Sequence, residues 1–276
     1  MGLRIATNIQ SIAAQRYLGI NTAKNAQTLE KLSSGSRINR AGDDAAGLAI
    51  SERLRGNIRS MEQATRNAQD GISMIQVSEG AMNEVSNMLI RLRELSIQTA
   101  SDTIGDLERG FVDKEVQQLK QEMERIAQST DYNGMKLLNG SGEMFEYQIG
   151  IHNDPTNDRT QFDSSLQKVT IESLGIADVS TATKESSQEN LGKLDNAINF
   201  VNSARSNLGA LQNRLQSTIN NLQVYHENIS AANSRIRDTD MAKETTELVK
   251  TNILSNANVA VLAQANQSKQ LALKLL

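Results

Sequence analysis

The sequence predicts a mainly α-helical protein: an elongated antiparallel helical bundle or coiled-coil rod with a small β-hairpin region, whose terminal helices pair on assembly. Three observations predict this fold class. A single proline, Pro155, in 276 residues leaves almost the whole chain free of the strongest helix breaker. Apolar residues recur at gaps of three and four over three long segments. One short middle stretch changes instead to alternation with a period of two.

The first long helix is expected from about residue 45 to 100. Its apolar seam runs through Ile58, Met61, Thr65, Ala68, Ile72, Ile75, Glu79 and Met82, then slips by one at Val85 and continues through Leu89 and Leu92. Such a slip is expected to twist the seam without ending the helix.

Two further seams share this period. The second comprises Val112, Val116, Leu119, Met123 and Ile126, and the third comprises Leu191, Leu194, Ile198, Val201, Leu208, Leu211, Leu215, Ile219, Leu222, Tyr225, Ile229 and Ile236. The segment SDTIGD at 101–106 has the Gly and Asp of a chain reversal. Three seams of compatible period therefore predict one bundle.

The middle of the chain predicts strands. Phe145, Tyr147, Ile149 and Ile151 alternate with polar residues, and Val169 and Ile171 repeat the alternation after a turn-rich stretch. Asn133-Gly134 and Asn139-Gly140 are turn dipeptides. We therefore expect a β-hairpin at about 141–175, packed on the end of the bundle by Tyr132, Phe145, Tyr147 and Phe162.

The two chain ends are amphipathic but poor in large apolar side chains. Residues 3–32 place Ile5, Ile9, Ile12 and Ile20 on helical spacing, and residues 245–276 carry mainly alanines and a few leucines. One such helix alone buries too little area to offset the entropy of ordering its backbone. We expect both ends to become ordered against a partner, which gives three segments: 1–44, 45–240 and 241–276.

Composition excludes several function classes. The 29 Lys and Arg against 32 Asp and Glu give a formal charge of −3, without the basic excess of a nucleic-acid-binding protein. With no Cys and two His, the chain cannot build a thiolate site or a multi-His metal site. No apolar run approaches a membrane span or a cleavable signal peptide, so membrane insertion is not expected. No cofactor is expected either, because the sequence offers no convincing cofactor-binding motif.

No catalytic constellation stands out. Asp43, Asp44, Asp238 and Asp240 are interpreted as helix caps, because short acidic clusters at helix junctions are most often caps. His226 lies in a helical stretch with no second His in reach, and is interpreted as a solvated residue. The long apolar stripes at both ends predict a protein that completes its fold with copies of itself.

Several motifs, in order, resemble bacterial flagellins. They are SSGSRINRAGDDAAGLAISERLRG at 33–56, NAQDGI at 67–72, RLRELSIQ at 91–98, DYNGMKLL at 131–138, NRLQSTINNLQVYHENISAANSRIRDTD at 213–240 and AQANQ at 263–267. The resemblance covers roughly residues 3–140 and 188–276. Only about 45 middle residues, 141–185, remain where large flagellins carry outer domains, so the chain resembles a minimal member of the family.

The resemblance implies a function and partners. It implies a structural, non-enzymatic subunit that polymerises into the secreted flagellar filament and is exported by the flagellar type III apparatus. It also implies filament cap and hook-junction proteins as neighbours and an export chaperone at the C-terminal helix. The residues expected to pack in the filament core are Ile5, Ile9, Ile12, Leu254, Leu262, Leu271 and Leu275.

The resemblance also implies a surface for a receptor or a second subunit at Arg91, Leu95 and Glu115, the positions at which Toll-like receptor 5 recognises flagellins. For Leu95 a seam position is the competing interpretation, because Leu92 lies three residues before it. Two other functions stay open at this point: a hook-associated filament-junction protein and a cytoplasmic signalling coiled coil.

Overall fold

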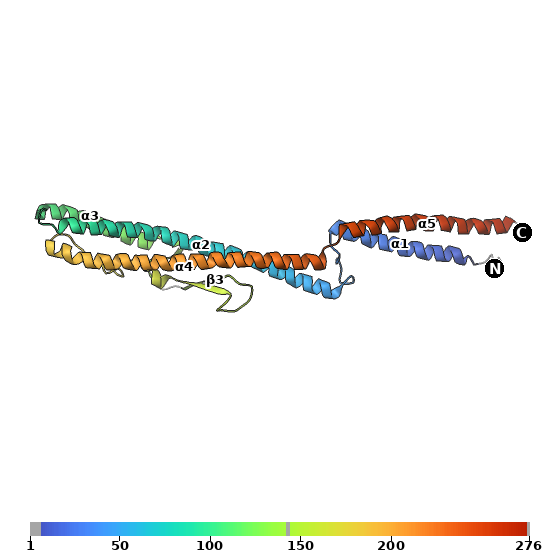
Figure 1. The fold of residues 1–276 in the computed structure, drawn as a ribbon, viewed down its shortest axis with the longest axis horizontal. Helices are drawn as coiled ribbons and strands as arrows, with labels where there is room; N and C mark the ends of the chain where they lie inside the picture. Colours follow the sequence, from blue (N-terminus) through green and yellow to red (C-terminus); the bar gives the residue numbers. More distant parts are fainter. Residues whose placement is uncertain (1–6, 142–143, 275–276) are drawn as a thin grey trace. The chain divides into compact units, whose positions relative to one another are not determined.

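The computed structural model describes residues 7–141 and 144–274, with side chains described as far as Ser268. The described residues are mainly α-helical, as predicted (Figure 1). The helices are α1 (Ile9–Ser34), α2 (Ala45–Thr99), α3 (Asp106–Ser129), α4 (Lys184–Arg237) and α5 (Met241–Lys274). The chain divides into two compact units, one formed by residues 1–58 and 227–276 and the other by residues 59–226.

The strands form two small antiparallel hairpins in the second unit. The first pairs β1 (Asp131–Tyr132) with β2 (Met135–Lys136), and the second pairs β3 (Met144–Gln148) with β4 (Arg159–Asp163). A 3₁₀ turn, η1 (Ser164–Gln167), follows β4 directly.

The core of the second unit follows an unbroken heptad seam along α2. Positions buried at alternating gaps of three and four are Met61, Ala64, Ala68, Gly71, Ile75, Ser78, Met82, Val85, Leu89, Leu92, Ser96 and Thr99. The predicted phase slip at Val85 is therefore wrong. It arose because Ala64, Gly71 and Ser78 are small and escaped a search for bulky apolar residues, although small side chains are what let neighbouring elements approach closely. A Cβ on Gly71 would lie 3.3 Å from a methyl of Leu215.

The second seam is confirmed, and the third is confirmed as far as Ile219; beyond it the predicted seam residue Tyr225 is 44 % exposed. Val116 and Met123 of α3, and Leu194, Val201, Leu208 and Leu215 of α4, are fully buried in one cluster with the α2 seam. Contacts between α2 and α3 run in opposite chain directions, since Arg91 contacts Glu115 while Arg109 contacts Thr99. Arg93 bonds Asp195 and Thr99 bonds Ser187, so α2 and α4 are antiparallel as well.

The reversal between α2 and α3 is held by Arg109. Its buried guanidinium donates from Nε to the Thr99 carbonyl at 3.0 Å, from Nη2 to the Ser101 carbonyl at 3.0 Å and from Nη1 to Asp106 at 2.8 Å. Carbonyls at the end of a helix have no intrahelical partner. One side chain thus satisfies carbonyls at the C-terminus of α2 and fixes the start of α3.

A buried lysine ties α3 to the segment before α4. Lys120 Nζ donates to the carbonyls of Ala177 at 2.6 Å and Val179 at 2.9 Å. Burial lowers the pKa of this ammonium, against Asp113 and Asp178, which raise it. Asp113 also accepts the Thr181 amide at 2.7 Å, so α3 holds the entry to α4 from two positions.

The turn of the first hairpin is the predicted Asn133-Gly134. Both residues have positive φ, 52° and 81°, as a two-residue type I′ hairpin turn requires. Asn133 is the non-glycine residue with positive φ among the described residues.

The second hairpin differs from the prediction in one strand. β3 contains the predicted Phe145 and Tyr147, but its partner is Arg159–Asp163, not the segment with Val169 and Ile171. The turn-rich stretch at 152–160 already contains the start of β4, since Arg159 and Thr160 pair with Gln148 and Tyr147 of β3. Val169 instead donates its amide to the Leu138 carbonyl at 3.1 Å and is buried.

Aromatic residues attach this hairpin to α2. The rings of Phe145 and Phe162 lie 6.0 Å apart, and Phe162 is fully buried. The Tyr147 hydroxyl lies 2.7 Å from the Met74 sulfur, and Asn67 Nδ2 donates to the Gln148 carbonyl at 2.9 Å. The hairpin therefore packs on α2 around residues 67–74, on the side of the bundle.

In the first unit, short polar contacts fix the junction between α1 and α2. Asp44 Oδ1 accepts the Gly47 amide at 2.8 Å, and Asp240 Oδ1 accepts the amides of Ala242 and Lys243, so both act as the predicted caps. Asp43 accepts the amides of Arg40 and Asn39, which lower its pKa. Backbone bonds join residues 35–37 to 237–239 in a short bridge.

Candidate assembly surfaces

The terminal helices α1 and α5 pair with each other in antiparallel fashion. Lys24 Nζ lies 2.5 Å from Glu247, Asn25 Nδ2 donates to Asn252 Oδ1 at 2.7 Å, and Asn8 Nδ2 donates to the Ala265 carbonyl at 3.0 Å. The hydrogen bonds from Lys24 and Lys250 lower the pKa of Glu247. Polar contacts thus fix the register along the pair.

Small side chains occupy the fully buried positions between these two helices, beside the half-buried leucines Leu18, Leu32, Leu248 and Leu262. The buried residues are Ser11, Ala14 and Thr28 on α1, and Thr251 and Ala265 on α5. Small residues let two helix backbones approach but contribute little apolar area. The fully buried positions of the pairing are therefore small, while the leucines beside them keep part of their surface exposed.

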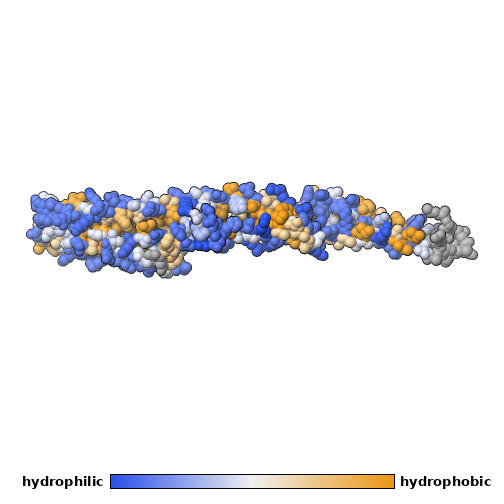
Figure 2. Space-filling model, turned by 90° about the horizontal axis from the view of Figure 1, so that it is seen from below, coloured by the Kyte–Doolittle hydropathy of each residue, from blue (hydrophilic) through white to orange (hydrophobic). Residues whose placement is uncertain are grey.

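Most of the larger apolar side chains of α1 and α5 face solvent. Ile9 is 70 % exposed, Ile12 58 % and Ile253 62 %. Others that remain exposed are Tyr17, Ile20, Leu29, Val249, Leu254, Val259 and Val261. In Figure 2, apolar patches interrupt the hydrophilic surface along this part of the molecule. Exposed apolar patches of this kind mark sites of association.

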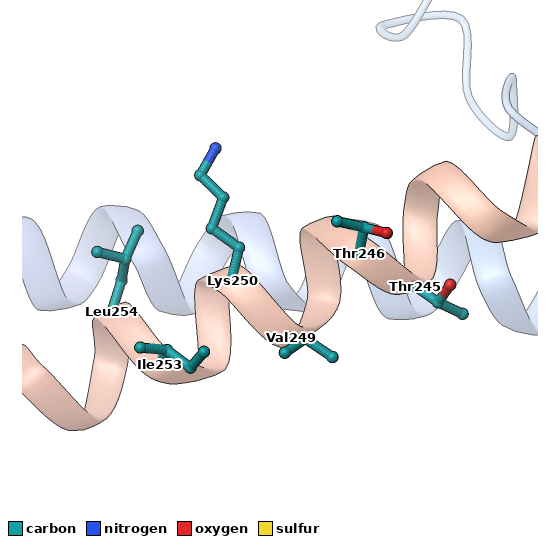
Figure 3. Close-up of a pocket in the computed structure, with 6 residues that line it drawn as sticks. All are labelled: Thr245, Thr246, Val249, Lys250, Ile253 and Leu254. Atoms are coloured by element: carbon teal, nitrogen blue, oxygen red, sulfur yellow. The ribbon is translucent and has the colours of Figure 1, made fainter.

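A shallow hollow of about 500 Å³ lies on α5 within this surface. Its lining residues all come from α5: Thr245, Thr246, Val249, Lys250, Ile253 and Leu254 (Figure 3). In Figure 3 α1 runs behind α5, and the Lys250 side chain projects away from Val249. The hollow is a helix face with three aliphatic side chains and one cation, which suits another helix better than a small molecule.

The predicted core-packing residues fall into three groups. Ile9, Ile12 and Leu254 lie on the exposed apolar face. Leu262 is half-buried, one turn after the half-buried Asn258 and three residues before the buried Ala265, on the face of α5 that meets α1. Ile5 and Leu275 lie outside the described residues, as does the side chain of Leu271.

Sequence reasoning missed part of this surface. Val249 and Ile253 lie one helical turn apart, and this spacing is the signal that could have identified them. The alanines at 257, 260 and 263 drew attention instead, because they extend the apolar stripe towards the chain end.

The predicted surface at Arg91, Leu95 and Glu115 is only partly exposed. The Arg91 guanidinium donates to Glu115 Oε1 from Nε at 3.0 Å and from Nη2 at 2.9 Å, and also to Glu94. These hydrogen bonds, that of Glu115 first, raise the pKa of Arg91. Leu95 is 2 % exposed and belongs to the core, so it is not a surface residue in this structure. Leu95 directly precedes the seam residue Ser96 and belongs to the same core cluster, as the competing interpretation held.

The remaining ionisable candidates form no reactive site. His226 Nε2 lies 3.3 Å from Glu62 Oε1 at the surface. Within residues 7–141 and 144–274, no cluster of three or more His, Asp or Glu could hold a metal ion. Of the helices in the part of the chain that is described, none is long and apolar enough to cross a membrane.

A helical bundle with its own core, joined to paired terminal helices that leave most of their larger apolar side chains exposed, defines a class: self-associating structural proteins. The chain belongs to the bacterial flagellin family. Residues 5–143 match the bacterial flagellin N-terminal helical region and residues 191–276 match the bacterial flagellin C-terminal helical region.

Similar proteins match over almost the full chain. The flagellin of Halalkalibacterium halodurans is 45 % identical over 98 % of this chain and 98 % of its own. A flagellar filament 30.7 kDa core protein of Treponema maltophilum is 44 % identical, again over 98 % of both chains. The flagellin of Bacillus subtilis is 42 % identical over 99 % of this chain and 100 % of its own.

Two solved structures are similar in fold. The crystal structure of Bacillus cereus flagellin has a TM-score of 0.51 and 30 % identity, covering 57 % of this chain and 88 % of that one. A putative flagellar hook-associated protein from Vibrio parahaemolyticus has a TM-score of 0.58, covering 71 % of this chain and 100 % of that one. Its identity is 13 %, so that likeness concerns the fold alone.

Proposed function

We propose that this chain is a structural subunit that polymerises into the bacterial flagellar filament, the helical propeller of a motile cell. One observation carries the proposal: the fully buried positions between α1 and α5 are small residues, and most of the larger apolar side chains of both helices stay exposed. Burial of an isoleucine or leucine stabilises a contact by about 1.5–3 kcal/mol. Identical neighbours supply the surface that covers these side chains.

The contact between copies is head-to-tail. A heterologous contact that does not close into a ring allows addition without limit, as a filament requires. We propose that residues 1–44 and 241–276 pack in the filament core and become fully ordered there, and that residues 45–240 form the surrounding rod with its hairpin. The seam of buried residues along α2, α3 and α4 supports an independent core for that rod.

The proposed subunit has no enzymatic activity and needs no cofactor. Flagellins are structural proteins, and the acidic residues that could have formed a reactive pair, Asp43 and Asp44, serve as acceptors for backbone amides. The chain performs its function by packing.

The subunit is secreted and functions outside the cell. We propose export through the flagellar type III apparatus, with a chaperone covering the apolar face of α5 around Leu254 before assembly. A helix laid on the α5 hollow would shield Val249 and Ile253 from premature association. In the filament, cap and hook-junction proteins are its neighbours at the two ends.

Recognition by Toll-like receptor 5 in a host is proposed for the exposed part of the predicted surface, Arg91 and Glu115. These residues form an ion pair that joins α2 and α3 at the surface. A partner that bonds Arg91 in solution must compete with Glu115 and Glu94.

The hook-associated alternative is not favoured, because near-complete matches to flagellins accompany only a fold-level likeness to a hook-associated protein. A cytoplasmic signalling coiled coil has no support among the relatives.

The proposal is tested by removing residues 1–44 and 241–276. The remaining fragment is expected to be folded and monomeric, and to form no filament when seeded with fragments of full-length polymer. The full chain under the same conditions is the control. Filaments of the truncated fragment would contradict the role given to the terminal helices.

A further inference from the structure

A groove in the second unit brings an imidazole and a carboxylate together. Its volume is about 330 Å³, and its lining residues are Met61, Glu62, Thr65 and Arg66 of α2 and Gln223 and His226 of α4. His226 Nε2 lies 3.3 Å from Glu62 Oε1, and the two side chains are 37 % and 50 % exposed. Residues 164 positions apart in the chain therefore present two metal-ligand side chains to the same space.

The groove is open because α3 does not reach it. From the Arg91–Glu115 contact and the antiparallel direction, the end of α3 is level with about residue 77 of α2. Beyond that level α2 and α4 continue as a pair, and the His226 ring and the Glu62 carboxylate stay accessible to solvent. An ion with its water ligands can therefore enter.

The separation of the two donor atoms suits a zinc ion. Zn²⁺ lies about 2.0–2.1 Å from an imidazole nitrogen and about 2.0–2.2 Å from a carboxylate oxygen, most often in a tetrahedral arrangement. Two ligands at these distances and at the tetrahedral angle lie about 3.3–3.5 Å apart. The observed 3.3 Å fits this separation, and it is long for a charge-assisted hydrogen bond, which is about 2.7–2.9 Å. Both atoms can therefore bind one ion with little movement of either side chain.

The neighbouring side chains leave the pair free for an ion. Arg66, the cation that lines the groove, donates from Nε at 3.2 Å and from Nη2 at 2.8 Å to Gln63 Oε1, so it leaves the Glu62 carboxylate to other partners. Gln223 lies one turn before His226 and also lines the groove. Among the described residues its amide has no hydrogen-bond partner, so its carbonyl oxygen is available as a third ligand.

We propose that Glu62 and His226 bind one Zn²⁺ ion in this groove, with the Gln223 carbonyl and water completing the coordination. The site has two ionisable ligands, one fewer than the three protein ligands that a catalytic zinc ion usually has. It is therefore an open site of modest affinity. Half the binding free energy of a four-ligand zinc site corresponds to a Kd of about 1–200 µM, which is the range expected here.

The bound ion links α2 to α4 where α3 no longer covers the pair. An ion that binds the folded chain and not the unfolded chain stabilises the fold, and at a free zinc concentration ten times Kd the ratio of folded to unfolded chain rises about 11-fold. All the proposed ligands belong to one chain, so binding does not depend on polymerisation.

The first test is calorimetric titration of the purified monomer with zinc chloride in a buffer without chelating groups. One ion per chain is expected. Loss of even a partner of a metal ligand costs about tenfold in affinity or more, so Glu62→Gln and His226→Gln are each expected to weaken binding at least about tenfold. Glu84→Gln, an exposed carboxylate elsewhere on α2, and His152→Gln are the matched controls and should bind zinc as the unmodified chain does. Magnesium chloride should give no binding, because Mg²⁺ prefers octahedral oxygen ligands.

The second test uses the two imidazoles of the chain, His152 and His226. In NMR spectra recorded during the same titration, the ring signals of His226 are expected to shift and those of His152, in the loop between β3 and β4, to stay unchanged. Thermal unfolding of each variant without zinc separates the loss of a ligand from the loss of the fold.

Equal zinc affinity of His226→Gln and the unmodified chain would overturn the site, as would a titration that shifts the His152 signals and leaves those of His226 in place. Binding weaker than about 1 mM, with no preference for zinc over magnesium, would do the same. None of these results bears on the proposed function, which is tested by polymerisation of the chain without added metal.

Discussion

Ile253→Ser tests whether the uncovered face of α5 is an assembly surface. Ile253 is 62 % exposed in the single chain and lines the α5 hollow. Full burial of an isoleucine contributes about 1.5–3 kcal/mol, so a neighbour that covers the exposed part contributes about 1–2 kcal/mol. Loss of that contribution is expected to raise the critical concentration about 5- to 30-fold.

The monomer should be nearly unaffected by the same change. Isoleucine and serine have similar helix propensities, and a surface substitution away from special features usually changes stability by less than about 0.5 kcal/mol. Leu166→Ser on η1, where the side chain is 59 % exposed, is the matched control and should leave the critical concentration unchanged.

The assay is seeded polymerisation followed by light scattering at a series of protein concentrations, with thermal unfolding of the monomer measured alongside. An Ile253→Ser chain that polymerises at the unmodified critical concentration would refute the reasoning. So would an equal loss in Leu166→Ser, because apolar area in general, and not the α5 face, would then control growth.

Three further predictions concern the second unit. Lys120→Met is expected to destabilise the monomer by about 2–3 kcal/mol in denaturant unfolding, because it leaves the carbonyls of Ala177 and Val179 without their charged donor; Lys114→Met, on the exposed side of α3, is its control. Burial raises the pKa of Tyr147. Above pH 10 the unfolded chain therefore loses the phenol proton at a lower pH than the folded chain does, and stability falls as the pH rises. Tyr147→Phe should flatten that decline in thermal unfolding measured from pH 9 to 11. Asn133→Ala is expected to cost about 1 kcal/mol, since alanine is strained at a φ of 52°, whereas Asn133→Gly should be tolerated, and equal melting temperatures for the two variants would contradict the turn assignment.

Helix periodicity predicted most of the fold. The seams on α3 and α4 and the reversal at 101–106 follow from large apolar residues at gaps of three and four, which bury one face of a helix wherever it packs. The method failed at Gly71 and Ser78, because a buried position that needs a small side chain carries no apolar signal. Leu95 shows the opposite error. The family resemblance placed it on a surface, whereas its spacing from Leu92 indicated a core position, and the side chain is buried.

The strand partner could not be derived from alternation alone. Val169 and Ile171 alternate as well as Thr160 and Phe162 do, and the pairing depends on which segment the turn at 149–158 brings back to β3. That turn is closed by Asp158, whose carbonyl accepts the amides of Ile149 and Gly150. A bond of this kind between distant residues leaves no mark in hydrophobic spacing.

For the proposed assembly surface, the sequence indicated candidate residues but not the direction in which their side chains point. Ile9 and Ile12 were identified from their spacing, but the spacing does not show that Ser11 and Ala14 face α5 in their place. The hydrogen bonds from Asn25 to Thr251 and Asn252 indicate which face of α1 meets α5. When that polar face is paired, Ile9 and Ile12 point away from α5.

Hydrogen exchange of the backbone amides of α1 and α5, compared between dilute monomer and assembled filament, tests the central claim most directly. Faces completed only by identical neighbours predict weak protection of both helices in the monomer and strong protection after assembly, with the amides of the α2–α3–α4 core protected in both states. Strong protection of α1 and α5 in the monomer that does not change on assembly would contradict the account.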